Sequence, residues 1–274
     1  MNETKTSVKL LVTVTFLLMT AANLLADTLP ISVQALRQIA GIFAGPFAPA
    51  EYTFAIWGLI YILLIGYVLY VLGFLKGMSS AAVGLMNTTG IFFSLSSIAN
   101  AMRIISWRSG RTALALLLDA VILICLLMIT AAISKASLSR RDRLFISFPM
   151  SLYFGWATFE AIQSAANLLR GMAWNGIPEH ILTAAALIAG AVICMAVMLR
   201  QKDTVYGLAF IWAYIGIIVR HILESWGELP MAAGAAGLSV ISFMIAELYL
   251  LRALSRDNRA ATARMALKQK AFRH

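Results

Sequence analysis

The sequence has little charge for its length, and this shortage excludes a soluble protein. Only 12% of the 274 residues are charged, about half the share of an ordinary soluble domain, whereas 61% are hydrophobic. Such a chain has too few polar side chains to cover a water-soluble globule. The mean hydropathy of +0.85 therefore indicates a protein that folds in lipid. The net charge of +10 would suggest nucleic acid in a soluble protein, but here it favours a membrane surface.

Histidine and cysteine are also scarce. The three histidines, His180, His221 and His274, lie at the ends of hydrophobic runs or in the C-terminal tail, so they predict no zinc or haem site inside the membrane. Cys125 and Cys194 lie inside hydrophobic runs without metal-ligand spacing, which is typical of buried thiols. We find no glycine-rich phosphate loop and no catalytic triad order. The sequence thus gives no argument for an enzyme, and we predict no catalytic residue and no metal ligand.

Long hydrophobic runs are abundant. A helix needs about 20 mostly hydrophobic residues to cross a bilayer, and a membrane β-barrel would instead show short alternating segments, which are absent. The sequence therefore predicts an all-α, polytopic transmembrane helix bundle of about eight helices. The predicted helices cover residues 8–26, 52–74, 81–103, 111–134, 144–169, 180–199, 204–222 and 229–252.

The distribution of lysine and arginine predicts the orientation of these helices. If all eight runs span and the N-terminus is cytoplasmic, 16 basic residues lie on the cytoplasmic side and 6 on the other. The positive-inside rule favours this arrangement, with both termini on the cytoplasmic side of a bacterial cytoplasmic membrane. Lys5 and Lys9 before the first run also resemble a secretory signal. However, Leu24 stands where a cleavage site near Ala26 needs a small residue, so we interpret the run as a retained helix.

Two segments lie outside the runs. Residues 27–51 contain three prolines together with isoleucine and phenylalanine, so we expect a structured loop folded over the mouth of the bundle. The tail 253–274 is basic, and we expect either a helix on the surface of an anionic leaflet or a disordered segment.

Three predicted helices carry mixed aromatic and polar stripes at helical spacing. Polar groups in hydrocarbon are costly and normally face the interior of a bundle, so the three stripes together favour a shared ligand cavity. The alternative for each residue is a hydrogen bond between helices or an aromatic anchor at the membrane interface. The stripes consist of Phe54, Trp57 and Tyr61; of Ser96, Asn100, Arg103 and Trp107; and of Tyr153, Trp156, Glu160, Gln163 and Asn167.

Four charged residues lie within the hydrophobic runs. Glu160 is near the middle of its helix and needs either a proton or a partner, for which Arg103 is a candidate unless it reaches the lipid headgroups. Asp119 and Glu247 lie in two other runs. Charges scattered over separate helices do not by themselves define a proton relay.

Part of the chain resembles a known family. The stretch from Pro46 through Pro49 to Trp57 and Tyr61 is similar to the proline-rich first loop and the following helix start of the translocator protein family, also called tryptophan-rich sensory protein or TspO/MBR. Ile98-Ala-Asn100 with Ser106-Trp107, and Pro149 to Phe159, agree with later family motifs in order and approximate spacing. The family's Asn-x-x-Trp reads Asn100-Ala-Met-Arg103 here, so an arginine replaces a tryptophan.

The resemblance implies a division of the chain and a function. Residues 1–172 would form a five-helix TspO-like core with residues 27–51 as a lid, followed by three additional transmembrane helices (173–252) and the basic cytoplasmic tail (253–274). The protein would bind a flat hydrophobic ligand, such as a porphyrin, a related tetrapyrrole or a sterol, in a sensory, regulatory or transport role. The pocket residues would be Trp57, Tyr61, Asn100, Tyr153, Trp156 and Phe159, with Glu160 tuning the pocket and Pro46 and Pro49 in the lid.

The expected partners are therefore a hydrophobic small molecule and membrane lipid, with no nucleic acid. A possible porphyrin is a ligand rather than a cofactor, and a homodimer is an open alternative. One competing function is a proton-coupled secondary transporter, which the absence of a detectable repeat pair disfavours. Another is a membrane enzyme that acts on a lipid or pigment.

Overall fold

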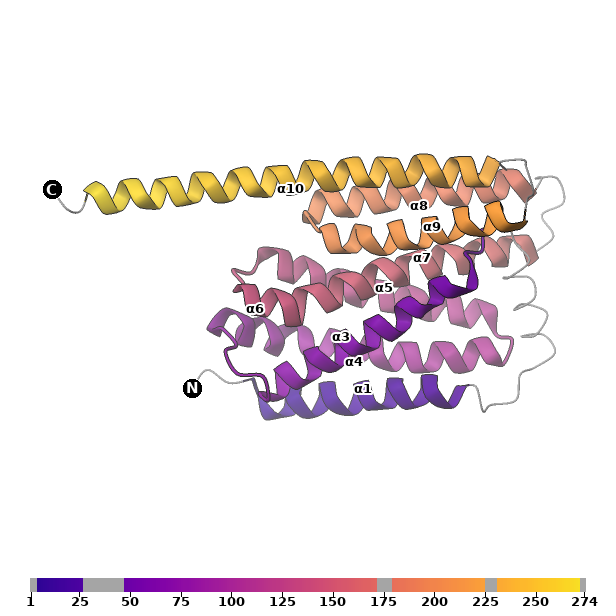
Figure 1. Cartoon of the computed structure of the whole chain (residues 1–274). Helices are drawn as coiled ribbons and strands as arrows, with labels where there is room; N and C mark the ends of the chain where they lie inside the picture. Colours follow the sequence, from indigo (N-terminus) through magenta and orange to yellow (C-terminus); the bar gives the residue numbers. More distant parts are fainter. Residues whose placement is uncertain (1–3, 27–46, 172–178, 225–230, 272–274) are drawn as a thin grey trace.

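The chain folds as a bundle of long helices. The computed structural model describes residues 4–26, 47–171, 179–224 and 231–271, and within these ranges it contains eight long helices and no strand (Figure 1). The long helices are α1 (Thr6–Ala26), α3 (Ile56–Leu72), α4 (Ser80–Arg108), α5 (Thr112–Lys135), α7 (Phe148–Gly171), α8 (Glu179–Gln201), α9 (Thr204–Glu224) and α10 (Met231–Ala271). The short ones are η1 (Glu51–Ala55), α6 (Arg140–Asp142) and η2 (Arg143–Ser147). The prediction of an all-α bundle of about eight helices is confirmed.

The helices have the properties of membrane spans. Seven of those in the described ranges are long and hydrophobic enough to cross a bilayer, and large side chains such as Leu10, Leu117 and Leu238 keep more than 60% of their surface exposed. Water would not tolerate so many exposed leucines, whereas lipid does. The chain is thus an integral multi-pass membrane protein.

Helix α7 is the exception in hydropathy, and its position explains why. Glu160, Gln163 and Asn167 lower its hydropathy, and it is not among the seven. Its 24 residues nevertheless extend over about 36 Å. Helix α7 contacts α3, α5, α8 and α9, so its polar side chains face protein rather than lipid. It is the central helix of the bundle.

Figure 1 shows how the other helices surround α7. Helices α1, α4, α5 and α7 contact one another in that order, and α3 contacts both α1 and α7. Helices α8, α9 and α10 pack together on the opposite side, where α9 lies against α7. A Cβ atom on Gly155 of α7 would lie 2.5 Å from the Tyr206 carbonyl oxygen, so glycine permits a very close approach of α7 to α9.

Local sequence explains several helix boundaries at the end of the bundle where the N-terminus lies. Ser79 caps α4 by accepting a hydrogen bond from the Ala82 N–H, and Asp203 caps α9 by accepting one from the Tyr206 N–H. Gly73 ends α3 at φ 90°, and the N–H of Phe74 reaches back to the Leu69 carbonyl oxygen, as in a Schellman motif.

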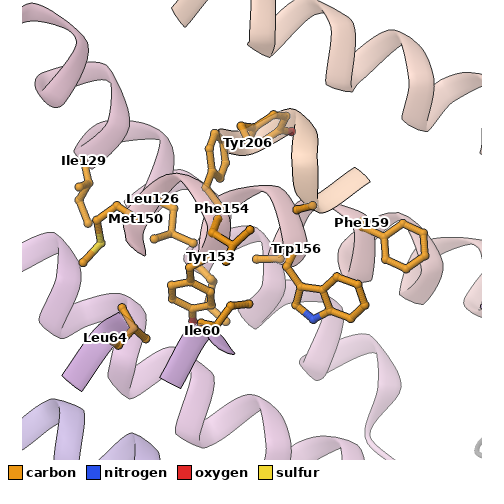
Figure 2. Packing of buried hydrophobic residues seen from close by; sticks show 14 of the residues in the cluster. Ile60, Leu64, Leu126, Ile129, Met150, Tyr153, Phe154, Trp156, Phe159 and Tyr206 are labelled. Carbon is orange, nitrogen blue, oxygen red and sulfur yellow. The ribbon is translucent and has the colours of Figure 1, made fainter. Parts of the chain in front are cut away.

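The core is rich in aromatic side chains that surround α7. Figure 2 shows Tyr153, Phe154, Trp156 and Phe159 of α7 projecting to different sides of this helix. Each is at most 5% exposed. Phe154 packs on Tyr206 of α9, with ring centroids 4.9 Å apart. Helix α7 therefore packs both against α3 and α5 and against the C-terminal helices α8 and α9.

Two predicted segments can be compared only in part. The lid prediction for 27–51 falls mostly outside the described residues, as does Pro46, and only residues 47–51 are described. For the tail 253–274, the structure favours the helical alternative, because α10 continues to Ala271 and extends beyond the bundle (Figure 1).

Candidate ligand-binding site

Aromatic side chains from α3, η1 and α7 gather in one cluster. We call it the aromatic cluster, and it consists of Phe54, Trp57, Tyr61, Tyr153, Trp156 and Phe159. Their ring centroids lie 5.4–6.0 Å apart in the pairs Phe54–Trp156, Trp57–Tyr61, Trp57–Tyr153 and Trp156–Phe159. Edge-on and tilted contacts at these distances are favourable for aromatic rings.

The cluster has a buried floor and a more accessible side. Trp156 and Phe159 have no exposed surface and Tyr153 has 1%, whereas Trp57 and Tyr61 are only partly buried. A flat ligand would therefore meet Trp57 and Tyr61 first. It would reach Trp156 only if the rings packed over it, such as Phe54, moved aside.

Glu160 lies at the polar edge of this cluster. Its Oε1 accepts hydrogen bonds from the indole N–H of Trp57 at 2.9 Å and from that of Trp156 at 3.0 Å. An indole N–H is only a donor, and the two lone pairs of one carboxyl oxygen can accept both of them. The spacing of four residues between Trp156 and Glu160 on one helix makes the second contact possible.

Arg103 of α4 provides the positive charge. Its Nη2 lies 3.5 Å from Glu160 Oε2, and its Nε lies 3.4 Å from Asp119 Oδ1 of α5. We call Arg103, Asp119 and Glu160 the charged cluster. The prediction that Arg103 pairs with Glu160 is confirmed. The expectation that the four intramembrane charges are scattered is wrong for these three, because α4, α5 and α7 bring them together.

Asn100 connects the aromatic cluster to α1. Its side-chain amide donates a hydrogen bond to the Tyr153 hydroxyl at 3.0 Å and accepts one from Asn23 at 2.9 Å. Asn23 also donates to the Met19 carbonyl oxygen of α1. Asn100 is 1% exposed, so this polar chain fixes the position of Tyr153 inside the bundle.

The end of the first loop packs over the aromatic cluster. We call residues 47–55 the loop end. Phe47 stacks on Phe159 with ring centroids 5.6 Å apart, and Phe54 lies edge-on to Trp156. Pro49, one of the two predicted lid prolines, is buried. The loop end therefore covers the deepest aromatic residues of the site.

Helix α9 holds the loop end in place. The Trp212 indole N–H donates to the Thr53 carbonyl oxygen at 2.8 Å, and the Ala50 N–H donates to the Gly216 carbonyl oxygen at 3.0 Å. A Cβ atom on Gly216 would overlap the Thr53 hydroxyl and lie 3.1 Å from Pro49 Cβ, so only glycine permits this contact. One of the additional C-terminal helices thus supports the site.

All seven residues predicted to bind a ligand come together in this region, and their role in binding stays a prediction. Sequence reasoning missed Asn23, the proximity of Asp119, and the contacts of Trp212 and Gly216. Tyr206, Phe210 and Tyr214 recur every four residues on α9, and this aromatic stripe was an available signal that α9 packs inward.

Glu247, the fourth intramembrane charge, lies apart from the site. It is 9% exposed on α10 and approaches Gly207 of α9, close to Met198 of α8. Cys194 also contacts Met198, with the two sulfur atoms 3.6 Å apart. Both cysteines are buried and free, as their positions in hydrophobic runs predicted. In the described part of the chain, no three histidine, cysteine or acidic side chains are placed to hold a metal ion.

Comparison with known proteins gives one match. A family model described as TSPO-like protein matches residues 9–249. This range includes nearly all of α1, the whole of α3 to α9, and α10 as far as Tyr249. No curated protein and no solved structure matches the chain.

Proposed function

Because the chain belongs to the TSPO-like protein family, we propose that it binds a flat, largely hydrophobic molecule between its transmembrane helices. Porphyrins, related tetrapyrroles and sterols are the classes to examine first. The observation that supports this proposal is the aromatic cluster beside a polar edge formed by Glu160, Arg103 and Asn100. Aromatic walls favour a flat ligand by contact area and stacking, while a few polar groups orient it.

The arrangement of the loop end suits a site that opens and closes. Phe47 and Phe54 cover Phe159 and Trp156, and both belong to a segment held by α9. Movement of the loop end would expose the floor of the cluster to a ligand. Binding would then be coupled to a change in the loop end, which is the kind of change that a sensory or regulatory role requires.

Replacing Trp156 by alanine tests the proposal. We expect Trp156→Ala to weaken binding of protoporphyrin by about 1–3 kcal/mol, the scale of one large hydrophobic contact. Quenching of tryptophan fluorescence in a titration of the purified protein in nanodiscs measures the affinity. Phe154→Ala is the matched control, because Phe154 is a buried aromatic residue of the same helix that faces Tyr206 instead. Equal affinity of Trp156→Ala and the wild type, with both proteins monodisperse, would falsify the assignment.

A proton-coupled transporter is the second candidate, and the charged cluster favours it. Two carboxyl groups that share one guanidinium inside a membrane protein could exchange a proton as a substrate passes. Flux of the bound molecule into proteoliposomes that depends on a pH gradient would favour this function. Saturable binding without flux would favour the binding protein, and chemical change of the bound molecule would favour an enzyme.

A further inference from the structure

The charged cluster contains one more negative group than positive groups. Arg103 is the one basic residue that contacts both Asp119 and Glu160. Glu160 is well supplied with partners, since it receives two indole N–H groups and the Nη2 of Arg103. Asp119 has fewer partners: the Nε of Arg103 on its Oδ1 and the side chain of Ser164, while its Oδ2 has no hydrogen-bond partner among the described residues. The surplus negative charge therefore falls on Asp119.

Several polar atoms beside this cluster are buried without a hydrogen-bond partner among the described residues. They are Asp119 Oδ2, the Tyr61 hydroxyl, Gln163 Nε2 and Asn167 Nδ2. Asp119 is 5% exposed and Gln163 is 6% exposed. A buried polar group without a partner costs free energy, and the cost is greater in a membrane interior. The unpartnered Oδ2 of Asp119, beside the guanidinium of Arg103, therefore indicates a site for a polar part of a ligand.

Two of these residues share a helix face with Glu160, and the other two lie near Arg103. Glu160, Gln163 and Asn167 follow helical spacing along one face of α7. Ser164 of α7 lies beside the Asp119 carboxyl group, and Arg103 and Glu160 are the charged groups that act on it. The Tyr61 hydroxyl lies near Arg103 and Glu160 as well. A ligand stacked on Trp57 and Tyr61 would thus have its polar edge near Asp119.

Building on the proposed binding function, we propose that the ligand of this site is a flat hydrophobic cation, and that Asp119 is its counter-ion. A protonated amine or an alkylated ring nitrogen fits this description. Such a group would neutralise the surplus charge and supply the hydrogen bond or ionic contact that Asp119 Oδ2 lacks. The faces of Trp57 and Tyr61 would add a cation–π attraction.

The same geometry disfavours a ligand that places a carboxylate against the charged cluster, whereas a porphyrin can bind with its propionate groups turned away from it. A carboxylate would need Arg103 as its partner, but that guanidinium already contacts both acids. It would also be repelled by the uncompensated charge on Asp119. An arginine at the position where the family carries a tryptophan therefore does not make this a site for anions, because Asp119 and Glu160 accompany it.

Three probes with the same ring system test the charge preference. They are 9-aminoacridine, which is a cation at neutral pH, uncharged acridine, and acridine-9-carboxylate. Their affinities are measured by tryptophan quenching in nanodiscs of phosphatidylcholine, so that the lipid adds no net charge. We expect the amine to bind about tenfold or more tightly than acridine, and the carboxylate to bind most weakly.

Asp119→Asn tests whether Asp119, rather than the rest of the site, causes the preference for the amine. This nearly isosteric change should reduce the affinity for the amine to within about threefold of that for acridine. Glu247→Gln is the matched control, since it removes a buried membrane acid that lies on α10 outside the site. The control should keep the wild-type preference for the amine.

Two results would overturn the proposal while leaving the binding function intact. One is that the wild type binds acridine or acridine-9-carboxylate as tightly as 9-aminoacridine or more tightly, while Trp156→Ala still weakens this binding. The other is an unchanged preference for the amine in Asp119→Asn. If neither the acridines nor protoporphyrin quench the wild-type protein, the binding function fails and the charge preference fails with it.

Discussion

Asp142 shows how one residue outside the membrane spans joins three helices. Its Oδ1 accepts hydrogen bonds from the Tyr70 hydroxyl at 2.7 Å and the Ser79 N–H at 3.3 Å, and its Oδ2 accepts from the hydroxyl and N–H of Ser139. Burial raises the pKa of this carboxyl group, but hydrogen bonds from Ser139, Tyr70 and Ser79 outweigh burial and lower the pKa to about 2. The ionised form is therefore the one that the fold requires.

We expect Asp142→Asn to destabilise the protein by about 1–3 kcal/mol, because an uncharged amide cannot accept all four bonds. The sign of the pH dependence follows from the lowered pKa. The stabilisation by Asp142 is fully present above the ordinary aspartate pKa near 4, and it is lost as the pH falls towards 2. Thermal unfolding in detergent at pH 7 and at pH 3 measures both effects. Glu51→Gln, at an exposed acid, is the control, and an equal loss in both variants would contradict the prediction.

The sequence could predict a contact between two residues where both lie on the same helix. The spacing of Trp156 and Glu160 placed them on one face of α7, and the indole–carboxylate bond at 3.0 Å agrees. Asp119 could not be assigned to the site in this way. Periodicity gives the face of a residue on its own helix but not which neighbouring helix that face meets, so the contact with Arg103 required the structure.

At the scale of elements, the positions of the helices could be predicted and their docking could not. Each long helix covers most of its predicted run, because about 20 hydrophobic residues are needed to cross a bilayer, although α10 continues past its run to Ala271. The role of α9 was unexpected. The sequence suggested three helices added to a complete core, whereas α9 contacts both α7 and the loop end. Small residues such as Gly155 and Gly216 determine that docking, and a single glycine does not identify its partner in sequence.

Gly216→Ala tests whether α9 controls access to the site. The added methyl group would overlap the Thr53 hydroxyl, so the loop end must shift away from α9. We expect ligand dissociation to become several-fold faster, with a smaller change in the association rate, because the closed state loses support. Stopped-flow displacement of bound protoporphyrin measures both rates.

Gly237→Ala is the matched control for this change. It makes the same substitution within a helix, at a position where a Cβ atom would meet nothing within 4 Å. Helix propensity alone favours alanine over glycine by about 1 kcal/mol, so the control should unfold at an equal or higher temperature. If Gly216→Ala matches the control in stability and in dissociation rate, α9 does not hold the loop end closed.

For the whole molecule, the predicted orientation places three arginines near the connection between α4 and α5. They are Arg103 and Arg108 of α4 and Arg111, which precedes α5. So many positive charges are unusual on the side of the membrane that has fewer of them. Arg103 faces Asp119 and Glu160 inside the bundle, and Arg108 is only 8% exposed. Two of the three arginines therefore lie inside the bundle rather than exposed in the loop, and the orientation with cytoplasmic termini stays a prediction.

Cysteine labelling tests this orientation directly. Ser109 and Ser137 are both exposed and lie at opposite ends of α5, and the native Cys125 and Cys194 are buried, so background labelling should be low. With cytoplasmic termini, a membrane-impermeant maleimide applied to intact cells should label Ser109→Cys but not Ser137→Cys. Inverted membrane vesicles should give the opposite result, because the 24 residues of α5 cross the bilayer once. Labelling of both positions from the same side would show that α5 does not span, and exchange of the two patterns would place the termini outside.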